Sequence, residues 1–487
     1  MGARSGERYL QGLREHPREV WVQGERVLGD IGQHPAFRNV TRSLASLYDM
    51  QLEPSLRDEM TYVSPSSGDR VGLSFIQPRT HEDLAKRTAM MKHWADFSGG
   101  MMGRTPDYLN VGLAAFSAAS SFFAQGDQRH GPNIQNYYEH VRENDLCMTH
   151  TLITPQVNRA VGPSQQVDPY IVARVVKETD AGLVIRGARM LATLGPIADE
   201  IEVFPSTVLR GNEEDIPYAF AFSIPVDSPG LKFICRESFD YGRSAFDHPL
   251  GSRFEEMDAI VVFEDVLVPW ERVFIYGDMR LCNGVFSETN AVAHMAHQVI
   301  VKNLAKAEFV FGVAALIGDR IGIDGFQHVQ EKLSEIILDI EAMRAFLRAS
   351  EADANIDAWG MMTPAFGPLN AARNMFPKLY PRMIEILQLL GASGLMAIPT
   401  EADTRSPIGP MIDKYLQGRN TDAYNRVKLF RLAWDIALSA FGSRQVLYER
   451  FFFGDPVRMA SALYTSYDKE PYKRRVQAFL DRPGHDG

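Results

Sequence analysis

The sequence predicts an α+β fold in which a helical region, a strand-rich region and a second helical region follow one another. Turn motifs separate amphipathic stretches in the first third, and β-rich runs begin near residue 145. Apolar residues at helical spacing return after residue 280. The chain has 487 residues, 45% of them hydrophobic, which is enough for two or three domains. We expect an N-terminal helical domain at 1–145, a middle β domain at 146–277 and a C-terminal helical bundle at 278–487.

A short segment of the N-terminal region can bring two polar side chains together. Its sequence is MMGRTPDY, residues 101–108. Thr105 is suited to cap a helix, and Pro106 is suited to the first helical position. Arg104 and Tyr108 then lie four residues apart across a helix start and can face one cavity. On spacing alone, such an arginine is more often a solvated or ion-paired residue.

The middle region alternates β-rich runs with turn sequences. Residues 171–190 place two such runs around Asp-Ala-Gly, and residues 219–235 repeat the pattern around Asp-Ser-Pro-Gly. Residues 259–269 supply another strand, and we expect Pro269 to end it because proline lacks the N–H that a sheet requires. The pattern predicts a sheet-rich domain.

The C-terminal region has the pattern of long helices packed side by side. One apolar stripe at steps of three and four is formed by Val329, Leu333, Ile336, Ile337, Ile340, Met343 and Leu347. Residues 378–395 provide a further helix. Together these stretches predict a four-helix bundle.

Composition limits the classes of partner. The chain has 51 basic and 61 acidic residues, a net charge of −10, and no basic run dense enough to follow a phosphate backbone. Its most apolar window, residues 111–124, is short and interrupted by serines, and the N-terminus has no signal-peptide core. We expect no nucleic-acid partner, no membrane attachment and a cytoplasmic location.

Cysteines and histidines show no metal-binding pattern. Cys147, Cys235 and Cys282 are far apart and odd in number, which argues against a disulfide framework. The motifs His-Glu-x-x-His and Glu-x-x-His are absent, and we expect His294 and His297 to pack within a helix. No metal site is predicted.

Five blocks of sequence resemble the oxygenase components of 4-hydroxyphenylacetate 3-monooxygenases, a family of two-component, FADH2-dependent phenol hydroxylases. They lie in the family's order at 101–108, 149–159, 188–207, 247–278 and 441–458. The resemblance covers nearly the whole chain. It implies an acyl-CoA dehydrogenase-like fold, with a β-barrel-like middle domain between two helical domains, and a homotetramer.

The resemblance also implies how the cofactor arrives. The sequence contains no Gly-x-Gly, so it lacks the dinucleotide-binding fingerprint and offers no nicotinamide domain. In the family, a separate NAD(P)H:flavin reductase supplies diffusible FADH2, and O2 is the co-substrate. We expect the same partner and the same cofactor here.

Hydroxylation of a phenol next to its oxygen needs a nucleophilic ring carbon, which phenolate supplies better than phenol. A free phenol has a pKa of about 10. The site must therefore stabilise phenolate charge and accept a proton, which calls for a cation, a hydrogen-bond donor and a base of near-neutral pKa. By resemblance, Arg104, Tyr108 and His150 surround the substrate hydroxyl in these roles, and His150 also contacts the flavin. A histidine beside a strand is, by itself, more often structural.

Further residues are assigned to the flavin by resemblance. They are Gln156, Val157, Asn158, Arg159 and Thr193 in the middle region, and Phe453, Gly454, Asp455 and Pro456 in the C-terminal region. Without the resemblance, PQVNR at 155–159 could be a polar loop, and FFFGDP at 451–456 could be a helix end followed by a turn.

The resemblance indicates 4-hydroxyphenylacetate as the substrate and 3,4-dihydroxyphenylacetate as the product. Ser206 and Thr207 match the positions at which the family binds the substrate carboxylate, and residues 208–219 match a lid loop. The lid sequence here is acidic, so phenol, halophenols and nitrophenols remain alternative substrates.

A more distant alternative is a lyase of the same fold, 4-hydroxybutyryl-CoA dehydratase. That enzyme holds an iron–sulfur cluster through three cysteines and one histidine. The three cysteines here do not have a matching spacing. Val301 also stands seven residues after His294, where the pattern requires a ligand.

Overall fold

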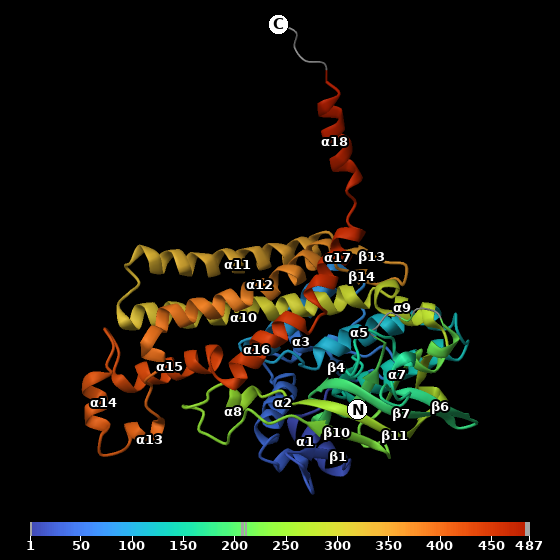
Figure 1. Cartoon of the computed structure of the whole chain (residues 1–487), viewed down its shortest axis with the longest axis horizontal. Coiled ribbons are helices and arrows are strands. Elements are labelled where there is room, and N and C mark those ends of the chain that lie inside the picture. The colour runs from blue at the N-terminus through green and yellow to red at the C-terminus, as the bar shows by residue number, and fades with distance from the viewer. Residues whose placement is uncertain (1, 206–208, 210–211, 483–487) are drawn as a thin grey trace.

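The helices and sheets of this chain are arranged in layers. The computed structural model describes residues 2–205, 209 and 212–482. In Figure 1 the long helices lie along the top of the body, the strands gather at the lower right, and one helical arm projects upward. The order helix, strand, helix agrees with the predicted α+β class.

The first third of the chain is mostly helical. Its helices are α1 (Gly6–Glu15), α2 (Arg38–Met50), α3 (Arg57–Met60), α4 (His81–Phe97), α5 (Asp107–Ala118), α6 (Ser120–Phe123) and α7 (His130–Asn144). Thr80 and Asp83 form a capping box that starts α4. Every residue of α5 except Ala118 is buried, so this helix is a core element.

A six-stranded sheet has the order β2-β1-β10-β11-β7-β6. Its strands are β1 (Glu19–Val22), β2 (Glu25–Arg26), β6 (Arg174–Thr179), β7 (Gly182–Thr193), β10 (Leu231–Cys235) and β11 (Asp258–Pro269). The two runs predicted at 171–190 form the antiparallel pair β6 and β7, and β11 ends at Pro269 as predicted. The N-terminal β1 pairs with β10, so the first domain expected from the sequence contributes strands to this sheet.

A second sheet has four strands in the order β12-β9-β8-β5. They are β5 (Met148–Thr151), β8 (Glu200–Val203), β9 (Phe220–Pro225) and β12 (Val273–Tyr276). The runs at 219–235 form β9 and β10 as strands, but these strands belong to different sheets. β5 and β8 run parallel, and their register places His150 opposite Glu202.

The C-terminal third forms the predicted bundle. Its helices are α9 (Met279–Glu288), α10 (Ala291–Ile321), α11 (Gln327–Ala352), α12 (Phe366–Gly391), α15 (Ala423–Ala437) and α16 (Ala440–Phe451). The central α10 packs against α4, α5, α11 and α12. The stripe predicted on α11 is buried at Ile336, Ile340 and Met343, but Ile337 is 42% exposed because its side chain lies on the outer side of the helix.

Shorter elements complete the body. They are α8 (Gly251–Phe254), α13 (Glu401–Thr404), α14 (Gly409–Tyr415) and the hairpins β3 (Thr61–Val63) with β4 (Arg70–Gly72) and β13 (Asn355–Ile356) with β14 (Met362–Thr363). None of the helices in the described part of the chain combines the length and the apolar character needed to cross a bilayer.

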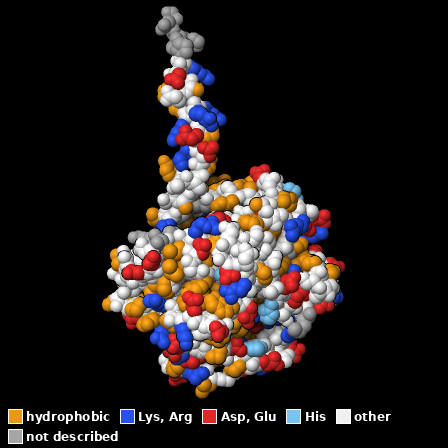
Figure 2. All heavy atoms as spheres, turned by 90° about the vertical axis from the view of Figure 1, so that its right-hand side faces the viewer, with side chains coloured by type: hydrophobic (Ala, Val, Ile, Leu, Met, Phe, Trp, Pro, Cys, Tyr) orange, Lys and Arg blue, Asp and Glu red, His pale blue; other side chains and the backbone are white. Residues whose placement is uncertain are grey.

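The chain ends in an arm formed by α17 (Pro456–Ser466) and α18 (Glu470–Leu480). Helix α18 stands clear of the body in both views (Figures 1 and 2). No residue of α18 is buried.

Candidate active site

The structure brings Arg104, Tyr108 and His150 together. The guanidinium carbon of Arg104 lies 4.2 Å from the centre of the Tyr108 ring. The ring centres of Tyr108 and His150 are 5.8 Å apart. Arg104 lies three residues before α5, Tyr108 lies in its first turn, and His150 comes from β5. A helix start and a strand of the smaller sheet therefore place a cation, a phenol and an imidazole side by side.

The start of α5 differs by one residue from the sequence prediction. The helix begins at Asp107, and Pro106 rather than Thr105 occupies the cap position, without a side-chain cap hydrogen bond. Pro106 already has helical dihedral angles, φ −55° and ψ −31°. Its fixed ring favours those angles, so Arg104 and Tyr108 keep the relative placement that the spacing predicted.

The environment sets the protonation of these groups. Burial, and then the positive charge of Arg104, lower the pKa of His150 well below its ordinary value. This corrects the expectation of a near-neutral base, because at neutral pH His150 is an uncharged acceptor. Burial raises the pKa of Tyr108, which therefore remains a hydrogen-bond donor.

Two groups that the sequence did not reveal hold Arg104 in place. Its main-chain N–H donates to the Glu256 carboxylate at 2.7 Å, and its Nη1 donates to the Tyr448 hydroxyl at 2.6 Å. The Tyr448 ring is stacked on Phe452, with ring centres 4.6 Å apart. Tyr448 lies on α16, far from Arg104 in sequence, so no local pattern could have linked the two residues.

A second arginine lies beside the predicted flavin residues. The guanidinium carbon of Arg373, on α12, is 4.8 Å from the centre of the Phe453 ring. Its Nε is buried without a hydrogen-bond partner, and it forms no ion pair with any residue that the structure describes. Burial lowers the pKa of Arg373 to about 10, so it is still a cation at neutral pH. It is therefore available to an anionic ligand.

A buried carboxyl group lies opposite His150 on the neighbouring strand of the four-stranded sheet. Glu202 on β8 is 3% exposed, and its Oε1 has no hydrogen-bond partner. Burial, and then the charge of Glu200, raise the pKa of Glu202 to about 8. Glu202 is thus mostly protonated at neutral pH. Only the pairing of β5 with β8 reveals it, because the sequence shows merely an acidic residue in a strand.

The middle-region residues assigned to the flavin lie in two settings. Gln156, Val157, Asn158 and Arg159 belong to an exposed loop after β5, where polar side chains can reach a bound group. Thr193 ends β7, and its hydroxyl donates to Asp258 at 2.7 Å. The exposed polar loop and the unpartnered Arg373 Nε suit a large ligand with polar and anionic parts, such as FAD.

The segment from Phe453 to Pro456 links α16 to α17. The Asp455 carboxylate accepts hydrogen bonds from the main-chain N–H groups of Val457 and Arg458, and Pro456 is the first residue of α17. Gly454 has a φ of +128°, a backbone angle that residues other than glycine rarely adopt. Locally the segment is thus a helix end followed by a capped turn, in agreement with the turn that Gly-Asp-Pro favours. That conformation holds Phe453 against Arg373.

The residues assigned to the substrate carboxylate, Ser206 and Thr207, lie outside the described residues. The described part of the same loop is anchored to the bundle. The main-chain N–H of Leu209 donates to Asn283 Oδ1 at 3.0 Å, and Asn283 Nδ2 donates back to the Leu209 carbonyl at 3.0 Å.

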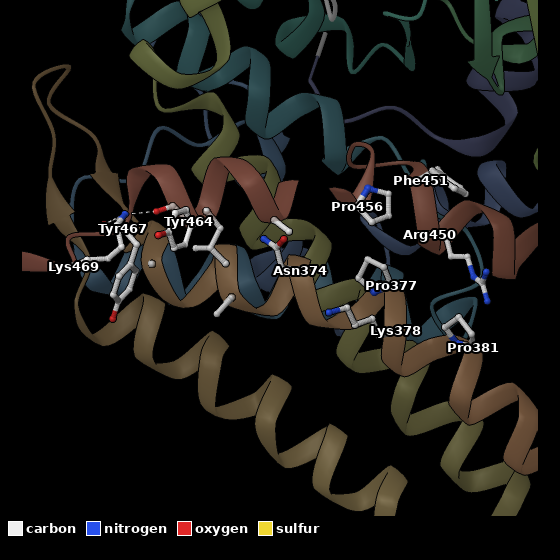
Figure 3. A pocket seen from close by; sticks show the side chains of 14 residues that line it. Asn374, Pro377, Lys378, Pro381, Arg450, Phe451, Pro456, Tyr464, Tyr467 and Lys469 are labelled. Carbon is white, nitrogen blue, oxygen red and sulfur yellow. Dashed lines mark hydrogen bonds between the residues drawn. The ribbon is translucent and has the colours of Figure 1, made fainter. Parts of the chain in front are cut away.

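A groove of about 1080 Å³ opens between α12, the end of α16 and α17 (Figure 3). Of the residues assigned from the sequence, it contains Pro456 but none of Arg104, Tyr108 and His150. This groove is therefore separate from the cluster of Arg104, Tyr108 and His150. A much smaller cavity, of about 10 Å³, lies beside Asn303, Arg373 and Phe453.

The histidines of α10 are engaged inside the helical core. Arg87 Nη2 donates to Nδ1 of His294 at 3.0 Å, and His297 Nε2 lies 3.0 Å from Glu351 Oε1. Both imidazoles are fully buried, as expected for packing residues. In the part of the chain that is described, no three His, Cys, Asp or Glu side chains are grouped so that they could hold a metal ion.

Two solved structures have the same fold as this chain. An oxygenase component of 4-hydroxyphenylacetate 3-monooxygenase complexed with FAD and 4-hydroxyphenylacetate superposes with a TM-score of 0.94, at 52% identity over 98% of each chain. A 4-hydroxybutyryl-CoA dehydratase from N. maritimus is 21% identical with a TM-score of 0.88 over 98% of this chain and 95% of that one. The acyl-CoA dehydrogenase-like fold expected from the resemblance is confirmed.

Curated relatives cover the whole length. The 4-hydroxyphenylacetate 3-monooxygenase oxygenase component of Geobacillus sp. is 52% identical over 99% of this chain and 97% of its own. That of Thermus thermophilus is 52% identical over 98% and 97%. A 4-nitrophenol 2-monooxygenase oxygenase component of Rhodococcus sp. is 34% identical over 93% and 86%.

Family models match both parts of the chain. The N-terminal model of 4-hydroxyphenylacetate 3-hydroxylase matches residues 5–275, and the C-terminal model matches residues 282–481. The chain therefore belongs to the 4-hydroxyphenylacetate 3-hydroxylase family.

Proposed function

We propose that this chain is the oxygenase component of a two-component monooxygenase that hydroxylates 4-hydroxyphenylacetate to 3,4-dihydroxyphenylacetate with FADH2 and O2. The observation that carries the proposal is the convergence of Arg104, Tyr108 and His150. These residues provide what a phenol needs to become a nucleophile, and the 52% identical relatives carry this activity in their names.

Each residue of the pocket has a defined role in the proposal. Neutral His150 accepts the phenol proton, which its low pKa permits only because Arg104 stabilises the phenolate at the same time. Tyr108 donates a hydrogen bond to the phenolate oxygen. Tyr448 and Glu256 fix Arg104, so the positive charge is in place before the substrate arrives.

The flavin is proposed to lie between the loop after β5 and the link between α16 and α17. Gln156, Val157, Asn158 and Arg159 would hold it from one side together with Thr193 and His150, and Phe453, Gly454, Asp455 and Pro456 would hold it from the other. Arg373 adds a cation for its anionic part. Once bound, reduced FAD supplies, with O2, the electrophilic oxygen atom.

We also propose a reductase partner and self-association of the chain. The absence of Gly-x-Gly favours an external NAD(P)H:flavin reductase as the source of FADH2. Exposed apolar side chains on the bundle, such as Leu338 and Leu389, support a homotetramer. We place the enzyme in the cytoplasm on the sequence argument alone.

Changing the two residues assigned to the substrate carboxylate tests which substrate the enzyme prefers. With a generic flavin reductase, the double variant Ser206→Ala/Thr207→Val should raise KM for 4-hydroxyphenylacetate about tenfold or more, since a hydroxyl bonded to a carboxylate contributes ~1.5 to 3 kcal/mol. Phenol, which has no carboxylate, should be nearly unaffected. Equal losses with both substrates would contradict the assignment.

Phenol, halophenols and nitrophenols are the alternative substrates. The 34% identical relative named as a 4-nitrophenol 2-monooxygenase favours this alternative, because related chains act on phenols without an acetate group. A wild-type preference for 4-nitrophenol over 4-hydroxyphenylacetate in the same assay would select it.

A further inference from the structure

We propose that Glu202 is the second acceptor of the proton that the substrate phenol loses, and that this proton reaches the Glu202 carboxylate through the imidazole of His150. The proposal rests on the proposed hydroxylation and adds one residue to it. Glu202 acts through His150 and not on the substrate, so its effect should be on proton transfer and not on substrate binding.

The pairing of two parallel strands brings the two side chains together. His150 on β5 is the register partner of Glu202 on β8. Neighbouring strands lie about 4.7 to 4.9 Å apart, and side chains at paired positions point to the same face of a sheet. On this face, His150 contacts the Tyr108 ring of α5. Ser223, which pairs with Glu202 from β9, donates to the Tyr137 hydroxyl of α7 at 2.5 Å. Glu202 therefore lies beside His150 on the face that α5 and α7 cover.

The fold leaves part of the Glu202 carboxyl group unused. Glu202 is 3% exposed, its Oε1 has no hydrogen-bond partner, and it forms no ion pair with any residue that the structure describes. A buried carboxyl group with an unpaired oxygen costs free energy, so stabilisation of the fold does not explain its presence. Burial and, to a smaller extent, the charge of Glu202 raise the pKa of Tyr108. Glu202 is thus within electrostatic reach of the candidate active site.

The two ring nitrogens of His150 allow the proton to move on. A neutral imidazole has one nitrogen with a free lone pair and one that carries a proton. The phenol O–H bond breaks and its proton joins the free nitrogen, while the other nitrogen releases its proton to Oε1 of ionised Glu202. The substrate is then phenolate, His150 is neutral again and Glu202 is protonated. Burial and the charge of Arg104 disfavour the imidazolium, so the second transfer removes the least stable form.

Neighbouring charges set the pH at which Glu202 can accept a proton. Burial, and then the charge of Glu200 on the same strand, raise the pKa of Glu202 to about 8. Glu200 itself binds Arg272 at 3.0 Å and lies 3.9 Å from Nε2 of His140. The ionised share of Glu202 therefore grows between pH 7 and pH 9. The other groups that face Glu202 or His150 are Tyr137 on α7, Tyr108 and Arg104 at α5, and Ser223 on β9.

Single turnovers at several pH values test the relay. Full-length protein is mixed with chemically reduced FAD, 4-hydroxyphenylacetate and O2, and product is measured. The wild-type rate at saturating substrate should rise with a midpoint near pH 8. Glu202→Gln should abolish this rise and lower the rate at pH 9 about tenfold, with less than about a twofold change in the half-saturating substrate concentration. Glu202→Asp keeps a carboxylate and should retain the rise. A Glu202→Gln profile identical to that of the wild type would overturn the proposal.

A neighbouring variant and a second substrate separate the relay from a packing role. Glu200→Gln removes a charge that raises the pKa of Glu202, so the midpoint should move to lower pH. With 3-fluoro-4-hydroxyphenylacetate, a more acidic phenol, Glu202→Gln should lower the rate by at most about threefold. The exposed Glu25→Gln is the control and should match the wild type.

The outcomes distinguish this proposal from the proposed function. An unmoved midpoint in Glu200→Gln, or equal losses with the two substrates in Glu202→Gln, would overturn the relay while leaving the hydroxylation standing. Absence of hydroxylated product from the wild type would overturn both.

Discussion

The candidate active site and a neighbouring cluster in the bundle both contain buried charged side chains, but only the cluster pairs them with a carboxylate. In the bundle, Lys302 Nζ lies 2.6 Å from Glu449 Oε1, and Lys306 binds the same oxygen. In the candidate active site, Arg104 forms no ion pair within the described part of the chain and instead donates to the Tyr448 hydroxyl. Buried charge that is paired holds helices together, whereas buried charge without a carboxylate partner is available to a ligand.

Burial explains how the bundle cluster tolerates two lysines and one carboxylate. It lowers the pKa of Lys302 to about 7, so the cluster approaches neutrality near physiological pH. The two regions are connected, because Tyr448 and Glu449 are consecutive on α16. The Tyr448 hydroxyl bonds Arg104 of the candidate active site, and the Glu449 carboxylate bonds Lys302 of the cluster.

The largest effect is expected from breaking the paired cluster. Glu449→Gln leaves two buried lysines without their counter-charge and should lower the free energy of unfolding by about 3 to 5 kcal/mol. Urea unfolding measures the change. Glu335→Gln, which breaks a more exposed pair with Arg382, is the control and should cost less than about 1 kcal/mol. Similar costs for both variants would contradict the structural role of the cluster.

The next effect should be on catalysis and not on stability. Arg104→Ala or His150→Ala should lower the rate of hydroxylation by about 10²-fold or more, the usual result of losing a positioned charge or base. Peroxide release from FADH2 and O2 should continue. Product and peroxide are measured together, and unchanged product formation in both variants would show that the phenol binds elsewhere.

Glu202 should affect stability mainly at the higher pH values. Its pKa in the folded protein, about 8, lies above its ordinary value of 4.5, so the folded state binds the proton more tightly than the unfolded state. Wild-type stability should therefore fall as pH rises from 4.5 to 8. Glu202→Gln removes this loss and should gain on the order of 4 kcal/mol relative to wild type at pH 8 but only about 1 kcal/mol at pH 5.

Thermal or urea unfolding at several pH values tests this expectation. The exposed Glu25→Gln is the control and should show no such trend. A stability difference between Glu202→Gln and wild type that stays constant from pH 5 to pH 8 would argue against a raised pKa of Glu202.

The smallest effect is expected from removing the Tyr448 hydroxyl that holds Arg104 in place. Tyr448→Phe keeps the ring stacked on Phe452 but removes the hydroxyl that accepts from Arg104. A hydrogen bond from a charged donor contributes about 1.5 kcal/mol at the lower end of its range, so kcat/KM should fall about tenfold, mainly through KM. The exposed Tyr464→Phe should leave both constants unchanged. A fall in thermal stability without a change in KM would instead make Tyr448 a packing residue.

Local patterns predicted much of the architecture. The strands β6, β7 and β11 and the bundle helices follow from β-rich runs, Pro269 and apolar periodicity, because these signals act within a few residues. The separation of β9 and β10 into different sheets could not be predicted in this way. A Pro-Gly turn indicates where a strand ends, but pairing with β8 or β11 depends on residues far away in the sequence.

The sequence by itself determined the fold class and three of the polar groups in the candidate site. The spacing around Pro106 indicated Arg104 and Tyr108. The resembling block at residues 149–159 indicated His150. Only the tertiary structure decided how those groups behave, because their pKa values depend on burial and on charges from other elements. It also revealed Tyr448, Arg373 and Glu202, which reach the site from α16, α12 and β8. Contacts between residues hundreds of positions apart leave no periodic signal in a single sequence.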